Sequence, residues 1–596
     1  MIDQATHPCV DFYHHVCDKW TMRYNVDTIG ISKRNAFKTV TNALLLTSAK
    51  STVTLPRSFR EFYTACYSFL ESKPRSSLSA LLQPLRGHAD ILSMGNFSLF
   101  LEHAIFLSLE WGIDVVFTLG LVGSMDSTHL RISPARNLLG KLDPNGDSPN
   151  LMDQLRPLLD FALAGTTLTT SAATILELDK ALKHDAADEP AAFSPVTILN
   201  RLENFLHITR WLRCINSLLP TEAHVNAQSM LVTDYFNAIE RGIATIYSAS
   251  SDGLVYAFLQ VLAELARFNY HRSVHSDDAP SASACFFAGA EVFGHSWARM
   301  FIELTSSGSS CKRTETIFRQ LVTLTTSSRA FAWTDETSRN RYRILLSGVR
   351  LYLYGDTDAA GSDATWGPSF VRWEAFPEDF LLAKREAQKR SLRNPRPLLT
   401  NVKDSLLYSG RVSYSGSLRA VVVPPISSSW PFCTSEEVPV EFDLGMLGVL
   451  MATEMSRAAF AHFRSGARLL ENRSELGGFS DCIRPIAQAV LGAPLGELSG
   501  RVTTEAFLWV RGVRLAQQLL SEALSKAATV DAQGWRNAHA TFFMRFCRLT
   551  CGTRTEPGGL SAEARCLLPL ANIPEFPIAF QCPVPSRMTH KSCEVL

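Results

Sequence analysis

One glutamate in an apolar segment of the chain stands at the spacing of a metal-dependent hydrolytic motif. Within Leu447–Arg457, Glu454 directly follows Thr453 and precedes Arg457 by three residues. Histidines at those two flanking positions would complete H-E-x-x-H, in which two imidazoles one helical turn apart bind a single zinc ion. The glutamate would then be the general base that deprotonates a zinc-bound water. The chemistry in question is therefore zinc-dependent hydrolysis.

The residues at the two ligand positions cannot replace histidine. A threonine hydroxyl is a poor zinc ligand, and a permanently protonated guanidinium offers no lone pair and repels a divalent cation. Because Thr453 and Arg457 occupy those places, the sequence predicts that the helix forms without its metal. We therefore expect no bound cofactor.

The acidic residues of this region also fit ordinary structural roles. Leu444–Phe463 reads as an apolar helix on which Glu454 and Arg457 form a surface pair at i and i+3. Glu505 follows two threonines, so it is equally typical of a carboxylate near a helix N-terminus, where the helix dipole favours negative charge. A site role for either glutamate needs support from the rest of the chain.

Composition places the chain among large folded proteins. It has 596 residues, 46% of them hydrophobic, and a formal net charge of +1, so charge favours neither nucleic acid nor an anionic membrane surface. The longest apolar stretches are interrupted by acidic residues or are too short to cross a bilayer. No basic segment followed by an apolar one begins the chain, so neither a signal peptide nor a membrane anchor is visible.

The cysteines favour an oxidising compartment. Of the 13 cysteines, four lie close to the chain ends: Cys9, Cys17, Cys582 and Cys593. Disulfides between them could tie the N-terminal residues to the C-terminal region. Two N-x-S sequons, at Asn96 and Asn472, agree with exposure to glycosylation. The sequence thus predicts an extracellular or cell-surface glycoprotein.

Hydrophobic spacing predicts a mainly helical chain. Apolar residues recur three and four positions apart in Phe59–Leu70, the period of one buried helical face. Similar patterns occupy Val196–Leu219, Met230–Ser248, Gly253–Phe268, Phe287–Thr305 and Thr334–Tyr354. Strand signals are fewer: a hairpin of Ile113–Leu119 with His129–Ile132, and Ser417–Val423 before two prolines. Polar stretches read as loops at Asp185–Pro195, Ser273–Ser283 and Gly355–Gly367.

Several short motifs follow one another in a recognisable order. They are Pro8–Tyr13 with Cys17 and Trp20, Phe62-Tyr63-x-x-Cys66, Trp333-x-Asp335-x-x-Thr337, Tyr414–Pro424, Thr504–Trp509, Cys551-Gly552-Thr553 and Cys593–Leu596. In this order they resemble landmarks in the ectodomains of neprilysin and the endothelin-converting enzymes, a family of zinc metallopeptidases. The resemblance covers nearly the whole chain, without the family's cytoplasmic tail and membrane anchor.

This resemblance implies a mainly α fold with two helical lobes that enclose a central chamber, and with small β elements. The implied N-terminal peptidase region is 1–375, with its first ~50 residues packing on the other lobe, and the implied catalytic-type lobe, of the gluzincin kind, is 376–596. Four disulfides are implied as well: Cys9–Cys582, Cys17–Cys551, Cys66–Cys285 and Cys482–Cys593. The resemblance leaves open how the other cysteines pair, namely Cys214, Cys311, Cys433, Cys547 and Cys566.

By the same resemblance, Glu454 is the family's general base and Glu505 its third zinc ligand. The family's aspartate that orients a ligand imidazole falls at Trp509, and its oxyanion-stabilising histidine falls at Gly559. Arg565 keeps the family's substrate-gripping arginine. The substrate-binding Asn-Ala pair falls at Arg411-Val412, just before the substrate-edge strand that begins at Tyr414.

We therefore expect a catalytically impaired homologue that binds extracellular peptides or acts as a decoy for them. The alternative is an active zinc metalloendopeptidase that uses an unrecognised ligand set. A sharper hypothesis is that the Arg457 guanidinium fills the vacated metal position and bridges Glu505 and Glu454, because two facing carboxylates would otherwise repel each other. The histidines His14, His15, His462 and His539 are expected to be surface or core residues rather than substitute ligands.

Overall fold

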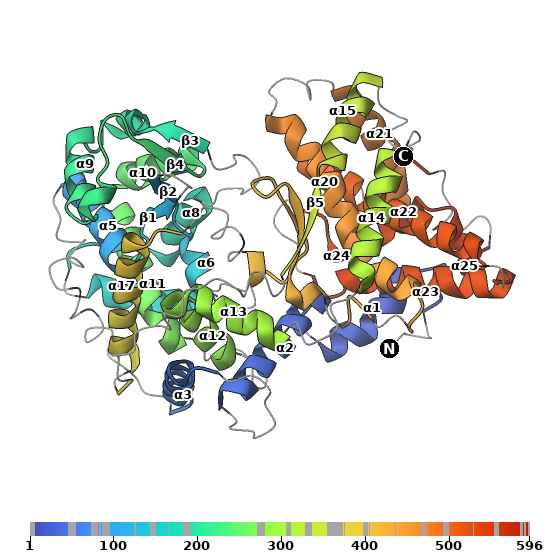
Figure 1. Cartoon of the computed structure of the whole chain (residues 1–596), viewed down its shortest axis with the longest axis horizontal. Coiled ribbons are helices and arrows are strands. Elements are labelled where there is room, and N and C mark those ends of the chain that lie inside the picture. Colours follow the sequence, from blue (N-terminus) through green and yellow to red (C-terminus); the bar gives the residue numbers. More distant parts are fainter. Residues whose placement is uncertain are drawn as a thin grey trace. The chain divides into compact units, whose positions relative to one another are not determined.

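The structure is a computed structural model, and its helices and small sheets are shown in Figure 1. It describes residues 6–24, 26–45, 55–72, 82, 85, 96–123, 127–142, 151–164, 166–182, 192–270, 280–305, 312–327, 336–354, 373–374, 376–396, 403, 406–428, 430–434, 437–465, 473–492, 500–527, 530–553, 559–583, 588 and 592–593. The prediction of a mainly helical protein with small β elements is confirmed.

The chain divides into two compact units. Unit 1 comprises Met1–Ala36, Ile302–Gly361 and Ser405–Leu596, and unit 2 comprises Phe37–Phe301 and Ser362–Asp404. The two unit boundaries at residues 36/37 and 301/302 fall inside helices, α2 (Thr28–Leu45) and α13 (His295–Thr305). The predicted division at residue 375/376 refers to the lobes of the family and not to these compact units, so it stays a prediction.

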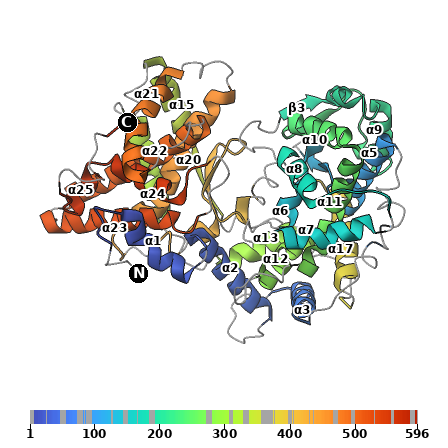
Figure 2. The ribbon, with the colours of Figure 1, turned by 180° about the vertical axis from the view of Figure 1, so that it is seen from behind.

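Unit 1 is a helical body around one hydrophobic core. Its helical elements are α1 (Phe12–Arg23), α14 (Lys312–Thr326), α15 (Glu336–Ser347), η6 (Pro425–Ser428), α19 (Glu441–Asp443), η7 (Leu444–Gly448), α20 (Val449–Ser465), α21 (Arg473–Leu491), α22 (Gly500–Lys526), α23 (Ala532–Thr550), α24 (Ala562–Ala571) and α25 (Glu575–Ala579). Helix α22 packs against α20 and α24, and α23 packs against α24 and α25, as Figures 1 and 2 show. The elements that carry the predicted site therefore belong to one core.

A three-stranded sheet completes unit 1, in the order β5-β7-β6. Strand β5 (Arg350–Leu353) pairs in parallel with β7 (Ala420–Val423), and β6 (Ser413–Ser415) pairs antiparallel with β7. All four residues of β7 are buried, as expected of a central strand. The chain turns between β6 and β7, where Arg419 has a φ of 47°. The segment predicted as one edge strand is therefore a hairpin, in which β6 lies at an edge of the sheet and β7 at its centre.

The N-terminal helix is held to the rest of unit 1 by disulfides. Helix α1 packs against α23 and α24, and the bonds Cys9–Cys582 and Cys17–Cys551 cross the chain over 573 and 534 residues. Unit 1 also contains Cys482–Cys593 and Cys547–Cys566. Removing a native disulfide of this kind typically costs about 2–5 kcal/mol. These bonds therefore fix where residues from both chain ends meet.

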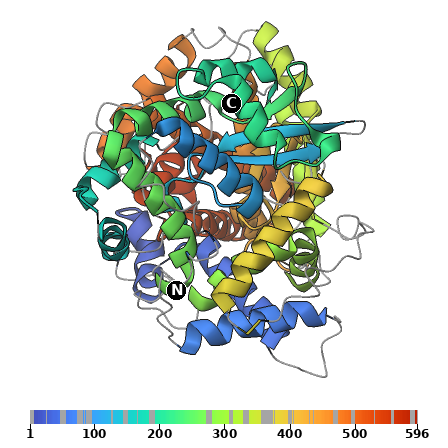
Figure 3. The ribbon, with the colours of Figure 1, turned by 90° about the vertical axis from the view of Figure 1, so that its left-hand side faces the viewer.

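Unit 2 combines helices with a four-stranded sheet of order β1-β2-β4-β3. Its strands are β1 (Phe117–Gly123), β2 (Thr128–Pro134), β3 (Ala192–Pro195) and β4 (Met230–Thr233). Its helical elements are α3 (Arg57–Ser72), α5 (Phe97–Phe106), η3 (Leu107–Trp111), α6 (Leu138–Leu142), α7 (Leu151–Leu163), α8 (Ala172–Leu182), η4 (Val196–Leu202), α9 (Ile208–Asn216), η5 (Thr221–Ala223), α10 (Phe236–Ser248), α11 (Ser250–Tyr270), α12 (Pro280–Phe293) and α17 (Phe376–Arg393). Figure 3 shows β1 and β2 in blue and α17 in yellow, and α17 packs against β1 and η3.

An aromatic cluster joins α3 to the helices after it in unit 2. Phe59 and Phe62 of α3 contact Phe293 and Trp297, whose own rings stack at 5.5 Å between centroids. The disulfide Cys66–Cys285 covalently joins α3 to α12 at the same place. Buried aromatic rings supply large apolar contact areas, so this cluster and its disulfide define the α3–α12 interface.

Several predicted helices are shorter in the structure. Phe59–Leu70 lies within α3 and Gly253–Phe268 within α11, as predicted. Val196–Leu219 instead forms η4 and α9, Met230–Ser248 forms β4 and α10, Phe287–Thr305 divides into α12 and α13, and Thr334–Tyr354 ends in β5. The segments β4 and β5 are strands because each pairs with a neighbouring strand; an apolar run of four residues by itself is compatible with a strand or a helix.

The strand and loop predictions were partly right. The antiparallel hairpin of β1 with β2 is confirmed, although β1 begins at Phe117 rather than at Ile113. The stretches predicted as loops contain β3, at Ala192–Pro195, and the start of α12, at Pro280. The predicted loop 355–367 lies outside the described residues. Within the described part of the chain, no helix has the length and apolar character needed to cross a membrane.

Candidate functional site

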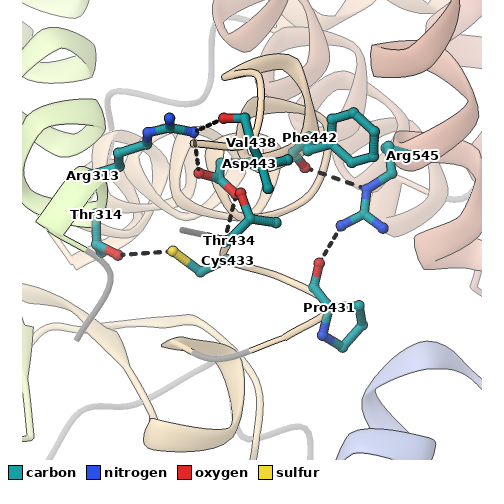
Figure 4. Close-up of polar contacts among 9 residues, drawn as sticks. All are labelled: Arg313, Thr314, Pro431, Cys433, Thr434, Val438, Phe442, Asp443 and Arg545. Carbon is teal, nitrogen blue, oxygen red and sulfur yellow. Dashed lines mark hydrogen bonds and ion pairs between the residues drawn. The ribbon is translucent and has the colours of Figure 1, made fainter. Parts of the chain in front are cut away.

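The segment before the Glu454 helix is fixed by a buried carboxylate. The Asp443 side chain is fully buried and accepts from the backbone N–H and the hydroxyl of Thr434, both at 2.8 Å. Arg313 on α14 donates to Asp443 at 3.2 Å and to the Val438 carbonyl at 2.5 Å (Figure 4). Burial raises the pKa of Asp443, and the hydrogen bonds from Thr434 and Arg313 oppose that rise. The carboxylate is thus fully used in holding this segment.

A second arginine holds the same segment from α23. Arg545 donates to the Pro431 carbonyl and, at 3.4 Å, to the Phe442 carbonyl (Figure 4). Burial lowers the pKa of Arg545 to about 10, so the guanidinium stays charged at neutral pH. Nearby, the Thr314 hydroxyl lies 3.8 Å from Cys433, which is disulfide-bonded. Side chains from α14 and α23 therefore set the position at which the site helix begins.

The site helix begins as a π-helical turn, η7, and continues as α20. Gly445 in η7 is required by a close approach, because a Cβ there would lie 2.7 Å from the Phe542 carbonyl oxygen of α23. Along α20 the residues Met451, Ala452, Met455, Ala458 and Ala459 are buried in the core. Their spacing of one, three and four residues marks one helical face, which places Glu454 and Arg457 at the margin of that face.

Thr453, at the first ligand position, is directed towards helix α22. Its residue exposure is 2%, and its hydroxyl has no hydrogen-bond partner among the described residues. A Cβ on Gly512 of α22 would lie only 2.1 Å from Thr453 Oγ1 and 3.0 Å from its Cα. The hydroxyl therefore packs against the α22 backbone, and the two helices touch at this pair.

Arg457, at the second ligand position, forms an ion pair with Glu454. Its Nε lies 3.1 and 3.2 Å from the two Glu454 carboxylate oxygens. The backbone N–H of Tyr414 on β6 donates to Glu454 Oε2 at 2.9 Å. The Glu454 side chain is 13% exposed and that of Arg457 is 47% exposed. The glutamate is therefore held by two donors from two elements, while much of the arginine faces solvent.

Glu505, on α22, is held by a different arginine. Arg565 Nε of α24 donates to Glu505 Oε1 at 2.8 Å, and the Leu560 N–H donates to Oε2 at 3.2 Å. The side chains of Arg565 and Glu505 are 16% and 20% exposed. Arg565 and Glu505 thus form an ion pair, and this pair links α24 to α22.

The hypothesis that the Arg457 guanidinium fills the metal position by bridging to Glu505 is wrong. The pair with Glu454 is present, but the ion-pair partner of Glu505 among the described residues is Arg565. The physical reason is that α24 supplies the Arg565 guanidinium to Glu505, so that carboxylate is neutralised without Arg457. Two separate ion pairs replace the single bridge that we expected.

The remaining predicted site residues have contrasting environments. The Arg411 side chain is exposed, whereas Val412 is 5% exposed and belongs to the hydrophobic core. Trp509, at the place of the family aspartate, is partly buried and lies 6.1 Å from the Phe546 ring. Gly559 is partly buried. A substrate-binding role for Arg411, Val412, Tyr414 or Arg565 stays a prediction.

The histidines considered as substitute ligands have other partners. His14 Nδ1 lies 2.8 Å from Asp11, and His15 Nδ1 lies 2.7 Å from the Thr6 carbonyl. His539 is fully buried, stacks on Trp535 at 3.9 Å between ring centroids, and accepts at Nε2 from α22 side chains. The side chain of His462 lies outside the described residues.

The side chains at the two ligand positions do not fit a zinc ion. Zinc binds thiolates, neutral imidazoles and carboxylates, but Thr453 offers a hydroxyl turned against α22 and Arg457 offers a cation. Within the described part of the chain, no three His, Cys, Asp or Glu side chains are grouped as metal ligands. The expectation that the protein binds no cofactor stays a prediction.

Cysteines and sequons complete the predicted sites. The four disulfides in the structure at Cys9, Cys17, Cys66 and Cys482 join the pairs that the family resemblance implies. Sequence reasoning left Cys547–Cys566 open, and only their packing on neighbouring helices shows the bond. Cys214, half-buried on α9, is the one free thiol among the described cysteines, and Cys311 lies outside the described residues.

Of the two predicted glycosylation sites, Asn96 is exposed and caps α5, whereas Asn472 lies outside the described residues.

Sequence reasoning missed the residues that position the site. Arg313, Asp443 and Arg545 lie far apart in the sequence, and no motif joins them. The one local signal is Asp443 itself, a charged residue directly before an apolar run. Its role is to hold the start of the site helix.

Comparisons with known proteins identify the fold. The sequence matches no protein-family model and no curated protein. The zinc metalloprotease Zmp1 of Mycobacterium tuberculosis, solved with an inhibitor, is similar at a TM-score of 0.67 and 13% identity, over 100% of this chain and 98% of that one. PepO of Lactobacillus rhamnosis is similar at 0.63 and 11%, over 98% of both chains, and a Haemonchus galactose-containing glycoprotein complex at 0.60 and 12%, over 100% and 97%.

These likenesses confirm the predicted resemblance at the level of the fold. Zmp1 and PepO are neprilysin-family zinc metallopeptidases, and this chain is similar to them over its full length. At 11–13% identity the comparison shows the fold alone, because one fold supports many activities. Activity has to be argued from the site.

Proposed function

We propose that this chain is a catalytically impaired protein of neprilysin-type fold that binds extracellular peptides without cleaving them. The observation that carries this proposal is the occupation of Glu454, whose oxygens accept from Arg457 Nε and from the Tyr414 N–H. A general base has to direct a lone pair at the water that attacks the scissile carbonyl. Here both carboxylate oxygens are directed at protein donors instead.

The loss of metal chemistry supports the same proposal. A peptidase of this kind needs zinc to lower the pKa of the attacking water and to polarise the carbonyl. The cation beside Glu454 is a guanidinium, which can neutralise a carboxylate but cannot bind and activate a water as a Lewis acid. Glu505, the other family carboxylate, is neutralised by Arg565.

An extracellular location is the second part of the proposal. Five disulfides join described cysteines, and disulfides persist mainly in oxidising compartments. The exposed Asn96 sequon is compatible with passage through the secretory pathway. Peptides as ligands follow from the activity of the two peptidases with the same fold, by analogy.

The competing candidate is an active zinc metalloendopeptidase that cleaves small extracellular peptides. Its support is that both family carboxylates are retained and that Glu505 is 20% exposed. This candidate requires a nitrogen or sulfur ligand set that differs from the family's, since neither Thr453 nor Arg457 can serve.

One experiment separates the two candidates. The full chain, secreted from a host with an oxidising pathway, is analysed for zinc by mass spectrometry and incubated with a mixture of extracellular peptides. We expect substoichiometric zinc, intact peptides and retention of part of the mixture. One zinc per chain together with cleavage that a chelator abolishes would establish the peptidase instead.

A further inference from the structure

The Arg457 guanidinium presents an unused edge at the position of the second family ligand. Its Nε donates to Glu454, whereas its two terminal nitrogens donate no hydrogen bond to the described residues, and 47% of the side chain is exposed. We propose that this edge binds a carboxylate of the peptide ligand. This inference rests on the peptide-binding function proposed above and names the group that the site recognises.

The guanidinium is held in place before a ligand arrives. Both Glu454 oxygens accept the Nε–H, and the Tyr414 N–H of β6 holds the Glu454 carboxylate in turn. A planar guanidinium with one donor fixed loses less rotational freedom when its other donors bind. Its two terminal nitrogens can donate to the two oxygens of one carboxylate, in two parallel charge-assisted hydrogen bonds. A chain of contacts from β6 through α20 therefore orients Arg457 for an anion.

The charges of the predicted site residues favour a negatively charged group on the ligand. Glu454 is balanced by Arg457, and Glu505 is balanced by Arg565. Arg411, exposed and three residues before Tyr414, adds a positive charge with no ion-pair partner among the described residues. Arg419, whose charge acts on the Tyr414 hydroxyl, adds another, so the β6 segment carries an excess of positive charge. A carboxylate is the common peptide group that would neutralise it.

The edge of β6 favours attachment through a carboxylate over attachment as an added strand. In an antiparallel pair, alternate residues direct their N–H groups away from the partner strand. Tyr414 is the middle residue of the three-residue strand β6, and its N–H is already donated to Glu454. The donor that an added strand would need at this point is therefore in use.

The test uses three pools of random hexapeptides with the full-length protein. One pool has free C-terminal carboxylates, a second has C-terminal amides and no acidic residues, and a third has C-terminal amides with one Asp or Glu. Retention in equilibrium dialysis is measured by mass spectrometry. We expect the protein to retain the first pool and to let the second pool pass through. It should retain the third pool if a side-chain carboxylate binds to Arg457 as a C-terminal carboxylate does.

Variants then locate the binding to Arg457. Arg457→Gln should weaken retention of the carboxylate pool by about tenfold or more, the value of one charge-assisted contact. Arg457→Lys keeps the charge without the planar edge, so its loss should be smaller. The matched control is Arg319→Gln, because Arg319 also pairs with a glutamate on its own helix and is 74% exposed. That variant should retain the pool as the unchanged protein does.

Each other outcome contradicts a stated part of the argument. Equal retention of the first and second pools, or full retention of the first pool by Arg457→Gln, overturns the carboxylate site but leaves peptide binding intact. No retention of any pool overturns peptide binding and this inference together. Shortened peptides in the dialysate would show cleavage and thereby favour the peptidase.

Discussion

Arg457 Nε lies 3.1 and 3.2 Å from the two carboxylate oxygens of Glu454, one helical turn before it on α20. The position at which H-E-x-x-H has its second histidine thus carries a cation that is paired with the predicted general base. The same glutamate also accepts the Tyr414 N–H from β6. Glu454 therefore joins α20 to the edge of the small sheet, which is a structural role independent of hydrolysis.

Replacement of Glu454 by alanine should destabilise the protein. Glu454→Ala leaves the Tyr414 N–H and the Arg457 Nε–H without their acceptor, which should lower the free energy of unfolding by about 1–3 kcal/mol. Urea unfolding measures this value. Glu315→Ala is the control, because the ion-pair partner of Glu315 among the described residues is an exposed arginine on its own helix, and it should change stability by less than about 0.5 kcal/mol. Equal effects would contradict the structural role.

The Glu505–Arg565 pair should be energetically coupled. Because both side chains are at most 20% exposed, a double-mutant cycle with alanine should give a coupling energy of about 1 kcal/mol or more. The same cycle on Glu315 and Arg319, which are 58% and 74% exposed, should give about 0.5 kcal/mol or less. A vanishing coupling for the first pair would mean that solvent screens it as well.

Gly512 should not tolerate a side chain. In Gly512→Ala the new Cβ would meet Thr453 Oγ1 at 2.1 Å and Thr453 Cα at 3.0 Å, so α20 and α22 would have to separate at a cost of about 1–3 kcal/mol. Gly478→Ala is the control: a Cβ there meets nothing within 4 Å, and alanine in an exposed helix should add about 0.5–1 kcal/mol. Thermal unfolding of both variants checks the difference in sign.

His539 should make stability depend on pH. Burial lowers its pKa below the usual 6.5, so the unfolded chain binds this proton more readily than the folded one. Its contribution is complete above the unfolded pKa and is lost as the pH falls towards the folded pKa. We expect His539→Gln to flatten the decline in urea midpoint between about pH 7 and 5. His224→Gln, at an exposed histidine, should leave the slope unchanged.

Long periodic segments and sequence motifs carried most of the predictable information. Phe59–Leu70 and Gly253–Phe268 are helical as predicted, because a buried face repeated over many residues has one explanation. Short apolar runs failed: Met230–Thr233 is β4 and Arg350–Leu353 is β5, since each is a strand only by virtue of the neighbour it pairs with. Nothing local distinguishes such a run from a turn of helix.

The amino-acid sequence by itself determined which residue types occupy the two flanking positions of the motif: a hydroxyl and a permanent cation stand where H-E-x-x-H has two neutral nitrogen donors. The local pair of Glu454 with Arg457 follows from their spacing on one helix, but only the tertiary structure decided which cation meets Glu505. Ion pairing depends on distances of a few ångströms between side chains from different elements, and those distances follow from how α24 packs on α22 and β6 lies against α20. For that reason Arg565, rather than Arg457, is the partner of Glu505.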